Sequence, residues 1–257
     1  MTTELIERRF ASIGARVRIA LAPRGRPEID VGSDRRGELF VLRVGGVHGV
    51  TVDVVDADRD DRALLLLVRD GGEKSKFLCG FDERHWFVAA IPERASGVGT
   101  VETAKDALLP SAVREAVARV RPKDRFRRRN PAYVRQGEWF FLPRWNLVVD
   151  EQDVLRNEPL TRGRGKAHVL EHAFRRGGET VYVDESHPMG ISREKFMRLP
   201  TSRRRAGWVE MVRNPELYAK GAVRHPDHAT IVLHGWHRVL MNTEHEARAM
   251  RHVAFLD

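Results

Sequence analysis

The chain has 257 residues, of which 42% are hydrophobic and 32% charged, with a net charge of +9 and an isoelectric point near 10.2. This hydrophobic content is enough for a packed core, and the single cysteine, Cys79, excludes an internal disulfide. No run approaches the roughly 18 apolar residues of a membrane-spanning helix, and the charged N-terminus lacks the apolar core of a signal peptide. We therefore expect a soluble cytoplasmic protein without a membrane partner.

The charge is unevenly distributed along the chain. Residues 1–110 contain 17 basic and 18 acidic residues, a net charge of −1, whereas residues 111–257 contain 28 and 18, a net charge of +10. Nine of the eleven histidines also lie in residues 111–257. This asymmetry predicts two functional parts, residues 1–120 and residues 132–257, joined by a basic segment at 121–131.

Residues 1–120 are expected to form a mostly antiparallel sheet with a few helices. Apolar residues at helical spacing favour a helix over Glu4–Ile13, and Ser111 is a good cap for a later helix. Residues 25–37 are polar and glycine-rich, which is typical of a loop. Alternating or continuous apolar runs predict strands at Ala15–Leu21, Glu38–Val44, Thr51–Val55, Ala63–Val68, Lys76–Cys79 and His85–Ile91. The run Ala63–Val68 is apolar throughout and is placed centrally.

The segment 121–131 contains six basic residues and one acid, with a proline near each end. Such a run is usually a solvated linker, but it could also contact phosphates, with Phe126 stacking on a base. Further basic clusters follow at 162–166 and 203–205. The candidate nucleic-acid contacts are Arg125, Phe126, Arg127, Arg128, Arg129, Arg162, Arg164, Lys166, Arg203, Arg204 and Arg205.

Residues 132–257 are also expected to be α+β. Strands are predicted at Glu138–Leu142, Asn146–Val149 and Glu179–Val183, and Ser192 can cap a helix through Leu199. Between His228 and His245, the apolar runs Ala229–Leu233 and His237–Met241 predict two strands, and the glycine of His234–Trp236 predicts a tight hairpin between them.

The histidines concentrate around this predicted hairpin. Five of the eleven lie between Arg224 and His245. In the segment His225–His228, Pro226 fixes φ and Asp227 can bond to its own backbone, so a turn is predicted that holds His225 and His228 together. After the hairpin, Thr243 and Glu246 fit a capping box, which predicts a last helix through about Val253.

Two kinds of chemistry fit these histidines. If residues 168–172 are helical, His168 and His172 share a face and could bind zinc together with His225 or His228. Without a metal, His225 and His228 could act as acid–base catalysts, with Asp227 orienting one imidazole.

Three function classes follow from these residues. The leading expectation is nucleic-acid binding through the basic second part, with RNA preferred over DNA. Aromatic residues interleaved with basic ones suit single-stranded nucleic acid. The alternative is a metal-dependent or histidine-based hydrolase acting on phosphate esters, with zinc as the candidate cofactor. The third is a scaffold that binds an acidic protein partner.

Overall fold

The computed structural model describes residues 3–22, 27–45, 50–162 and 166–247. The chain is mostly β, with several antiparallel sheets and a few short helices, as the sequence predicts. No helix among these residues is long and apolar enough to cross a membrane.

The chain begins with helix α1 (Thr3–Ser12), which buries Ile6 and Phe10 against a three-stranded sheet. The sheet consists of β1 (Val17–Ala22), β2 (Glu28–Asp34) and β3 (Gly37–Gly45) in the order β1-β3-β2. β1 and β3 are parallel. The expected loop at residues 25–37 is wrong over β2, because pairing with β3 and burial of Ile29 outweigh the local glycine, serine and aspartate content.

A four-stranded antiparallel sheet follows in the order β4-β5-β6-β7. Its strands are β4 (Thr51–Asp58), β5 (Ala63–Asp70), β6 (Glu73–Asp82) and β7 (His85–Ile91). The central position of β5 is confirmed, and its continuous apolar run has a clear reason. Leu64 and Leu66 pack in the same core as α1, whereas Ala63 and Leu65 pack in a second core with helix α2 (Val101–Ala107).

Helix α2 begins after Thr100 in a capping box, and helix α3 (Ser111–Val117) follows it. The cap of α3 is Pro110, not the expected Ser111, which is already the first helical residue. A short 3-10 turn, η1 (Pro122–Asp124), then leads into the basic segment.

The later strands form a six-stranded antiparallel sheet in the order β10-β11-β15-β16-β9-β8. Its strands are β8 (Val134–Gln136), β9 (Trp139–Pro143), β10 (Leu155–Leu160), β11 (His168–Arg176), β15 (Glu216–Arg224) and β16 (Ile231–Met241). Residues Phe141, Leu170, Ala219 and Leu233 of its inner strands lie in one core. The expected strand Asn146–Val149 is absent, and that segment is irregular with Val148 exposed.

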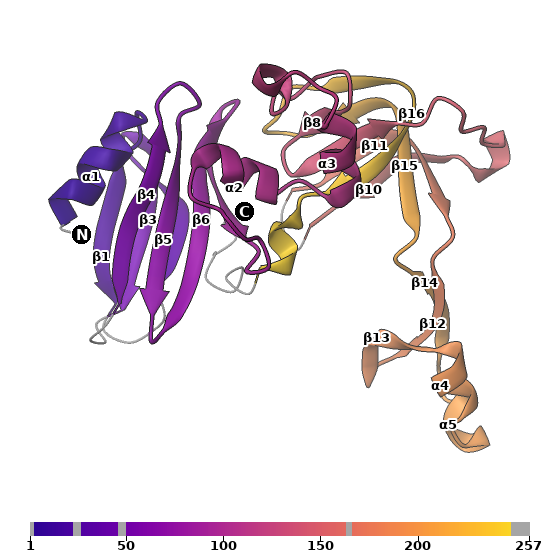
Figure 1. The fold of residues 1–257 in the computed structure, drawn as a ribbon. Helices are drawn as coiled ribbons and strands as arrows, with labels where there is room; N and C mark the ends of the chain where they lie inside the picture. The colour runs from indigo at the N-terminus through magenta and orange to yellow at the C-terminus, as the bar shows by residue number, and fades with distance from the viewer. Residues whose placement is uncertain (1–2, 23–26, 46–49, 163–165, 248–257) are drawn as a thin grey trace.

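An arm, residues 177–215, is inserted between β11 and β15 and projects away from the six-stranded sheet (Figure 1). It contains a small sheet of β12 (Glu179–Asp184), β13 (His187–Ser192) and β14 (Val209–Arg213), with helices α4 (Arg193–Met197) and α5 (Thr201–Arg204). The cap of α4 by the Ser192 side chain is confirmed.

The expected hairpin at His234–Trp236 is wrong, because β16 runs through it as one strand. Gly235 has a φ of +92°, and the pairing with β15 passes from Ala219↔His237 to Gly221↔Leu233. Three residues of β16 therefore oppose Lys220 alone, so the glycine forms a bulge instead of a turn.

The capping box expected at Thr243 is also wrong. Asn242 caps the 3-10 turn η3 (Thr243–Glu246), while the Thr243 hydroxyl donates to the Ala107 carbonyl. The rest of the expected last helix lies outside the described residues. A further 3-10 turn, η2 (Glu151–Asp153), precedes β10.

Candidate metal centre

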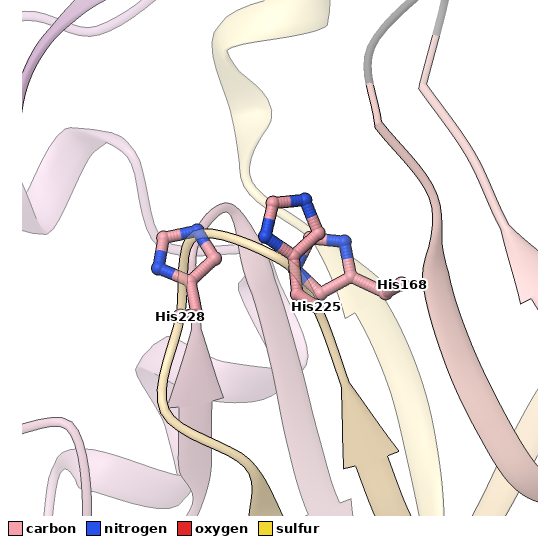
Figure 2. A group of neighbouring side chains, drawn as sticks. All are labelled: His168, His225 and His228. Atoms are coloured by element: carbon pink, nitrogen blue, oxygen red, sulfur yellow. The ribbon is translucent and has the colours of Figure 1, made fainter.

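Three histidines meet at one end of the six-stranded sheet, as Figure 2 shows. His168 is the first residue of β11, and His225 directly follows the last residue of β15. The two strands are antiparallel with Val169 opposite Arg224, so the register places His168 beside His225. The bend over residues 226–228 then brings His228 back to the same place, as the sequence predicts for His225 and His228.

The three imidazoles are close enough to hold one ion. One possible ligand atom from each lies within 4.8 Å of the other two. The ring centroids are 4.2 Å apart for His168 and His225, 4.7 Å for His225 and His228, and 5.7 Å for His168 and His228. We call these residues the histidine cluster.

Two ring nitrogens of the cluster are buried without a hydrogen bond to any described residue. They are Nε2 of His168 and Nδ1 of His228. A buried polar atom without a partner is costly, and it often indicates an ion or water that completes the site. The side chain of His168 is almost fully buried, with 2% of its surface exposed.

His225 is held more tightly by its own loop. Its Nδ1 accepts the backbone N–H of Asp227 at 3.1 Å, and its Nε2 lies 3.3 Å from the Lys166 carbonyl oxygen. Lys166 also forms an ion pair with Asp227 at 3.0 Å. The Lys166 carbonyl can take only an N–H, so Nε2 is the protonated nitrogen, and the lone pair of Nδ1 must give up the Asp227 N–H to bind an ion. Asp227 therefore contacts His225 through its backbone, and not through its carboxylate as expected.

Burial keeps the cluster neutral. It lowers the pKa of His168 to about 3, with the neighbouring His225 and His228 adding to the effect. It also lowers the pKa of His225, where His228 contributes, and the pKa of His228, which Asp82 partly offsets. Neutral imidazoles can lie this close without charge repulsion, and the neutral form is the one that binds metals.

Gly137 leaves space between two members of the cluster. It lies in the turn between β8 and β9 with a φ of +56°. A Cβ atom added there would lie 3.1 Å from Nε2 of His228 and 3.5 Å from Nε2 of His168. Both Nε2 atoms therefore border the same small volume, in which a glycine is the residue that leaves room for a ligand.

Charged residues surround the cluster on the side of the four-stranded sheet. Glu83, in the turn between β6 and β7, has its Oε2 atom 3.6 Å from Nδ1 of His228. Arg128 forms ion pairs with both Asp82 and Glu83, and Arg135 pairs with Asp82 at 3.1 Å. These contacts connect the turn between β6 and β7 of the four-stranded sheet to the segment that precedes β8 and to β8 itself.

A cavity of about 630 Å³ lies beside the cluster. His228, Gly137 and Glu138 are among its lining residues, and so are the apolar Leu78 and Phe87. Its lining comes from both parts of the chain, including the four-stranded sheet, β2, α2, the basic segment, β8, β9 and η3. This size is typical of a small-molecule site.

His172 does not join the cluster. Residues 168–172 are part of strand β11, so the helical hypothesis that paired His168 with His172 is wrong. Four strand residues span about 13 Å, and Nε2 of His172 faces Arg156 at 3.4 Å instead. Its Nδ1 is buried without a hydrogen-bond partner among the described residues.

Most of the expected phosphate-contacting residues bind other parts of the chain. Arg125 donates to the Val120 carbonyl, Arg127 pairs with Asp124 and Arg129 donates to the Val232 carbonyl. Phe126 packs with the core around α3. Arg162 pairs with the buried Glu244 and Lys166 with Asp227. Arg203, Arg204 and Arg205 lie on the arm, and Arg164 lies outside the described residues.

Glu83, Gly137 and Glu138 are site residues that the sequence analysis did not single out. Each lies in a two-residue turn. A glycine is ordinary there, and neither glutamate belongs to a motif, so the sequence alone contains no signal for them. No protein-family model, curated protein or solved structure matches the chain.

Proposed function

We propose that the chain is a metal-dependent hydrolase of phosphate esters, with the ion held by His168, His225 and His228. The observation that carries this proposal is the meeting of three neutral imidazoles, two of which have a buried nitrogen without a partner. Three histidines are a common ligand set of catalytic zinc sites, which keep one position open for water.

A zinc ion in such a site supplies a water with a pKa lowered to about 7 and a positive charge that polarises a phosphoryl oxygen. The chain's own residues have supporting roles. Gly137 leaves the approach to both Nε2 atoms free of a side chain. Glu138 lines the adjoining cavity, so its carboxylate is the candidate general base.

An anionic substrate suits the charge of this arrangement. Three neutral ligands leave the full charge of a divalent ion uncompensated, and the net charge of +10 over residues 111–257 adds a positive field. We propose that residues 1–120 and 132–257 are two functional parts joined by the basic segment 121–131. The cavity, which residues from both of these parts line, then receives the substrate.

The test is hydrolysis of bis(p-nitrophenyl) phosphate by the full chain with added Zn²⁺ or Mn²⁺. We expect His168→Ala and His228→Ala to reduce the rate to that of the free metal ion, while His172→Ala keeps the wild-type rate. His172 is the matched control because it lies on the same strand outside the cluster. Equal activity in all variants would contradict the proposal.

Nucleic-acid binding is the second candidate function, with RNA as the preferred ligand. The arm favours it, because Arg203 and Arg205 are exposed and neither forms an ion pair with a described residue. Free guanidinium groups on a projecting element are available for phosphate contacts. An acidic protein would meet the same charged surface, so it is the competing partner.

A further inference from the structure

Glu83 reaches the histidine cluster from a different sheet. It lies in the two-residue turn closed by the pairing of Asp82 with His85, and its φ is +53°. Asparagine, aspartate and glycine are the usual residues at such turn positions, because a positive φ is unfavourable for a longer side chain. The chain therefore places a glutamate where the local backbone does not favour one.

Both carboxylate oxygens of Glu83 have a partner at the boundary between the two sheets. Its Oε2 accepts the backbone N–H of Ala229 at 2.9 Å, and its Oε1 pairs with Arg128. Only 13% of its side-chain surface is exposed. The bond to Ala229 anchors the loop that contains His228. Glu83 therefore holds the backbone next to that histidine and also lies beside its ring.

Oε2 of Glu83 also lies 3.6 Å from Nδ1 of His228, which is buried and has no hydrogen bond to a described residue. This separation is slightly longer than a hydrogen bond, and a movement of about 0.5 Å would close it. The other ring nitrogen, Nε2, borders the volume beside Gly137 and His168.

We propose that Glu83 is the positioning residue of the metal centre and accepts the Nδ1–H of His228. This inference rests on the proposed metal site. The hydrogen bond fixes the tautomer in which the lone pair of Nε2 faces the ion, and the carboxylate makes the imidazole a stronger ligand. The four-stranded sheet thus takes part in a centre whose ligands all come from the six-stranded sheet and its loop.

Two other roles for Glu83 fit the geometry less well. As a direct ligand it would belong to the group of ligand atoms within 4.8 Å of one another, but among the described residues that group contains the three histidines. As a purely structural link it would serve the bond to Ala229 and the ion pair with Arg128 alone. That role does not explain why its carboxylate faces the unpaired nitrogen of His228.

The experiment is a Co²⁺ titration of the metal-free full chain, followed by visible absorption, for wild type, Glu83→Gln and Glu38→Gln. A glutamine can still accept the Ala229 N–H, but it weakens the interaction with His228 by removing the charge. Glu38 is the matched control, since its carboxylate likewise accepts a backbone N–H, that of Trp86, and contacts Nδ1 of a histidine, His85, that does not belong to the cluster. Loss of an outer carboxylate typically costs 10–100-fold in metal affinity.

We expect Glu83→Gln to weaken Co²⁺ binding by about 10–100-fold and Glu38→Gln to leave it unchanged. Wild-type affinity in Glu83→Gln would overturn this inference and leave the proposed function intact. Absence of Co²⁺ binding by the wild-type chain would overturn both. A second measurement needs no variant: in the zinc-loaded, ¹⁵N-histidine-labelled chain, His228 should have a protonated Nδ1 and a metal-bound Nε2. The opposite tautomer would also overturn the inference.

Discussion

Gly137 determines whether the histidine cluster has room for a ligand. Alanine in its place would put a methyl group between Nε2 of His168 and Nε2 of His228. We expect Gly137→Ala to abolish metal binding at the cluster, because the methyl group occupies the space that an ion would need. Zinc affinity measured by competition with a chromophoric chelator checks this expectation.

The control separates this effect from backbone strain. Gly71 has nearly the same φ, +54°, but a Cβ atom there meets nothing within 4 Å. Both substitutions place alanine in the left-handed region, at a cost of about 1–2 kcal/mol of stability. Gly71→Ala should therefore lower the melting temperature similarly while it retains wild-type zinc affinity. Equal zinc affinity in both variants would show that Gly137 does not border the ligand.

The burial of His237 predicts that the stability of the fold depends on pH. Its side chain is buried, and burial is the main reason that its pKa is lowered below 6.5, partly offset by a bond to the Gly235 carbonyl. Below about pH 6.5 the unfolded state therefore binds more protons than the folded state. The contribution of His237 to stability is complete above that pH and is lost as the pH falls towards the folded pKa.

His237→Asn keeps a donor for the Gly235 carbonyl and removes the titration. We expect its stability to fall less steeply than that of the wild type as the pH is lowered below about 6.5, measured by urea unfolding at several pH values. The exposed neighbour His234 supplies the control His234→Asn, which should follow the wild type. Identical slopes for wild type and His237→Asn would exclude His237 as the source.

Individual site residues differ in how far the sequence predicts them. The proximity of His225 and His228 follows from a proline and an aspartate between them, which is local information. His168 joins them only through the register of β11 against β15, over a sequence separation of 57 residues. Glu83 comes from another sheet, so no local pattern could indicate it.

Among the elements, β11 and β16 show why periodicity misleads at short range. The i, i+4 histidines of β11 suggested a helix face, but alternate burial and pairing on both sides make the segment a strand. In β16 a glycine suggested a turn, yet positive φ serves a bulge equally well. Tertiary pairing decides both cases, and it is not encoded in a window of a few residues.

The arm gives a test of the second candidate function at the scale of an element. Replacing Arg203 and Arg205 by alanine should weaken binding of single-stranded RNA. The slope of log K, the logarithm of the binding constant, against log[salt] should also become shallower by about 1.4, since two phosphate contacts are lost. Fluorescence anisotropy at several salt concentrations measures both quantities.

Arg35 and Arg36 provide a control with the same loss of charge. Both are exposed in the turn between β2 and β3, far along the chain from the arm. If the arm binds RNA, the variant Arg35→Ala/Arg36→Ala keeps the wild-type slope. Equal weakening in both double variants would mean that binding reflects total charge and that the arm has no special role.

For the whole molecule, the order of apolar runs and helix caps along the chain indicated the α+β class with mostly antiparallel sheets. The strands of residues 38–91 were largely predictable because their apolar runs are long. The charge difference between the two halves suggested a division of labour, but not the contacts across it. Arg128, expected to bind phosphate, instead bridges Asp82 and Glu83. Charge in a sequence does not reveal which basic residues are neutralised within the fold.

The central claim is that His168, His225 and His228 together hold one metal ion. Its most direct test is equilibrium dialysis of the metal-free full chain against Zn²⁺, with metal and protein measured in the same samples. We predict one tightly bound zinc per chain in the wild type and in His172→Ala, and loss of that zinc in His168→Ala, His225→Ala and His228→Ala. Zinc that is absent from the wild type, or that persists when any of the three cluster histidines is replaced, would contradict the claim.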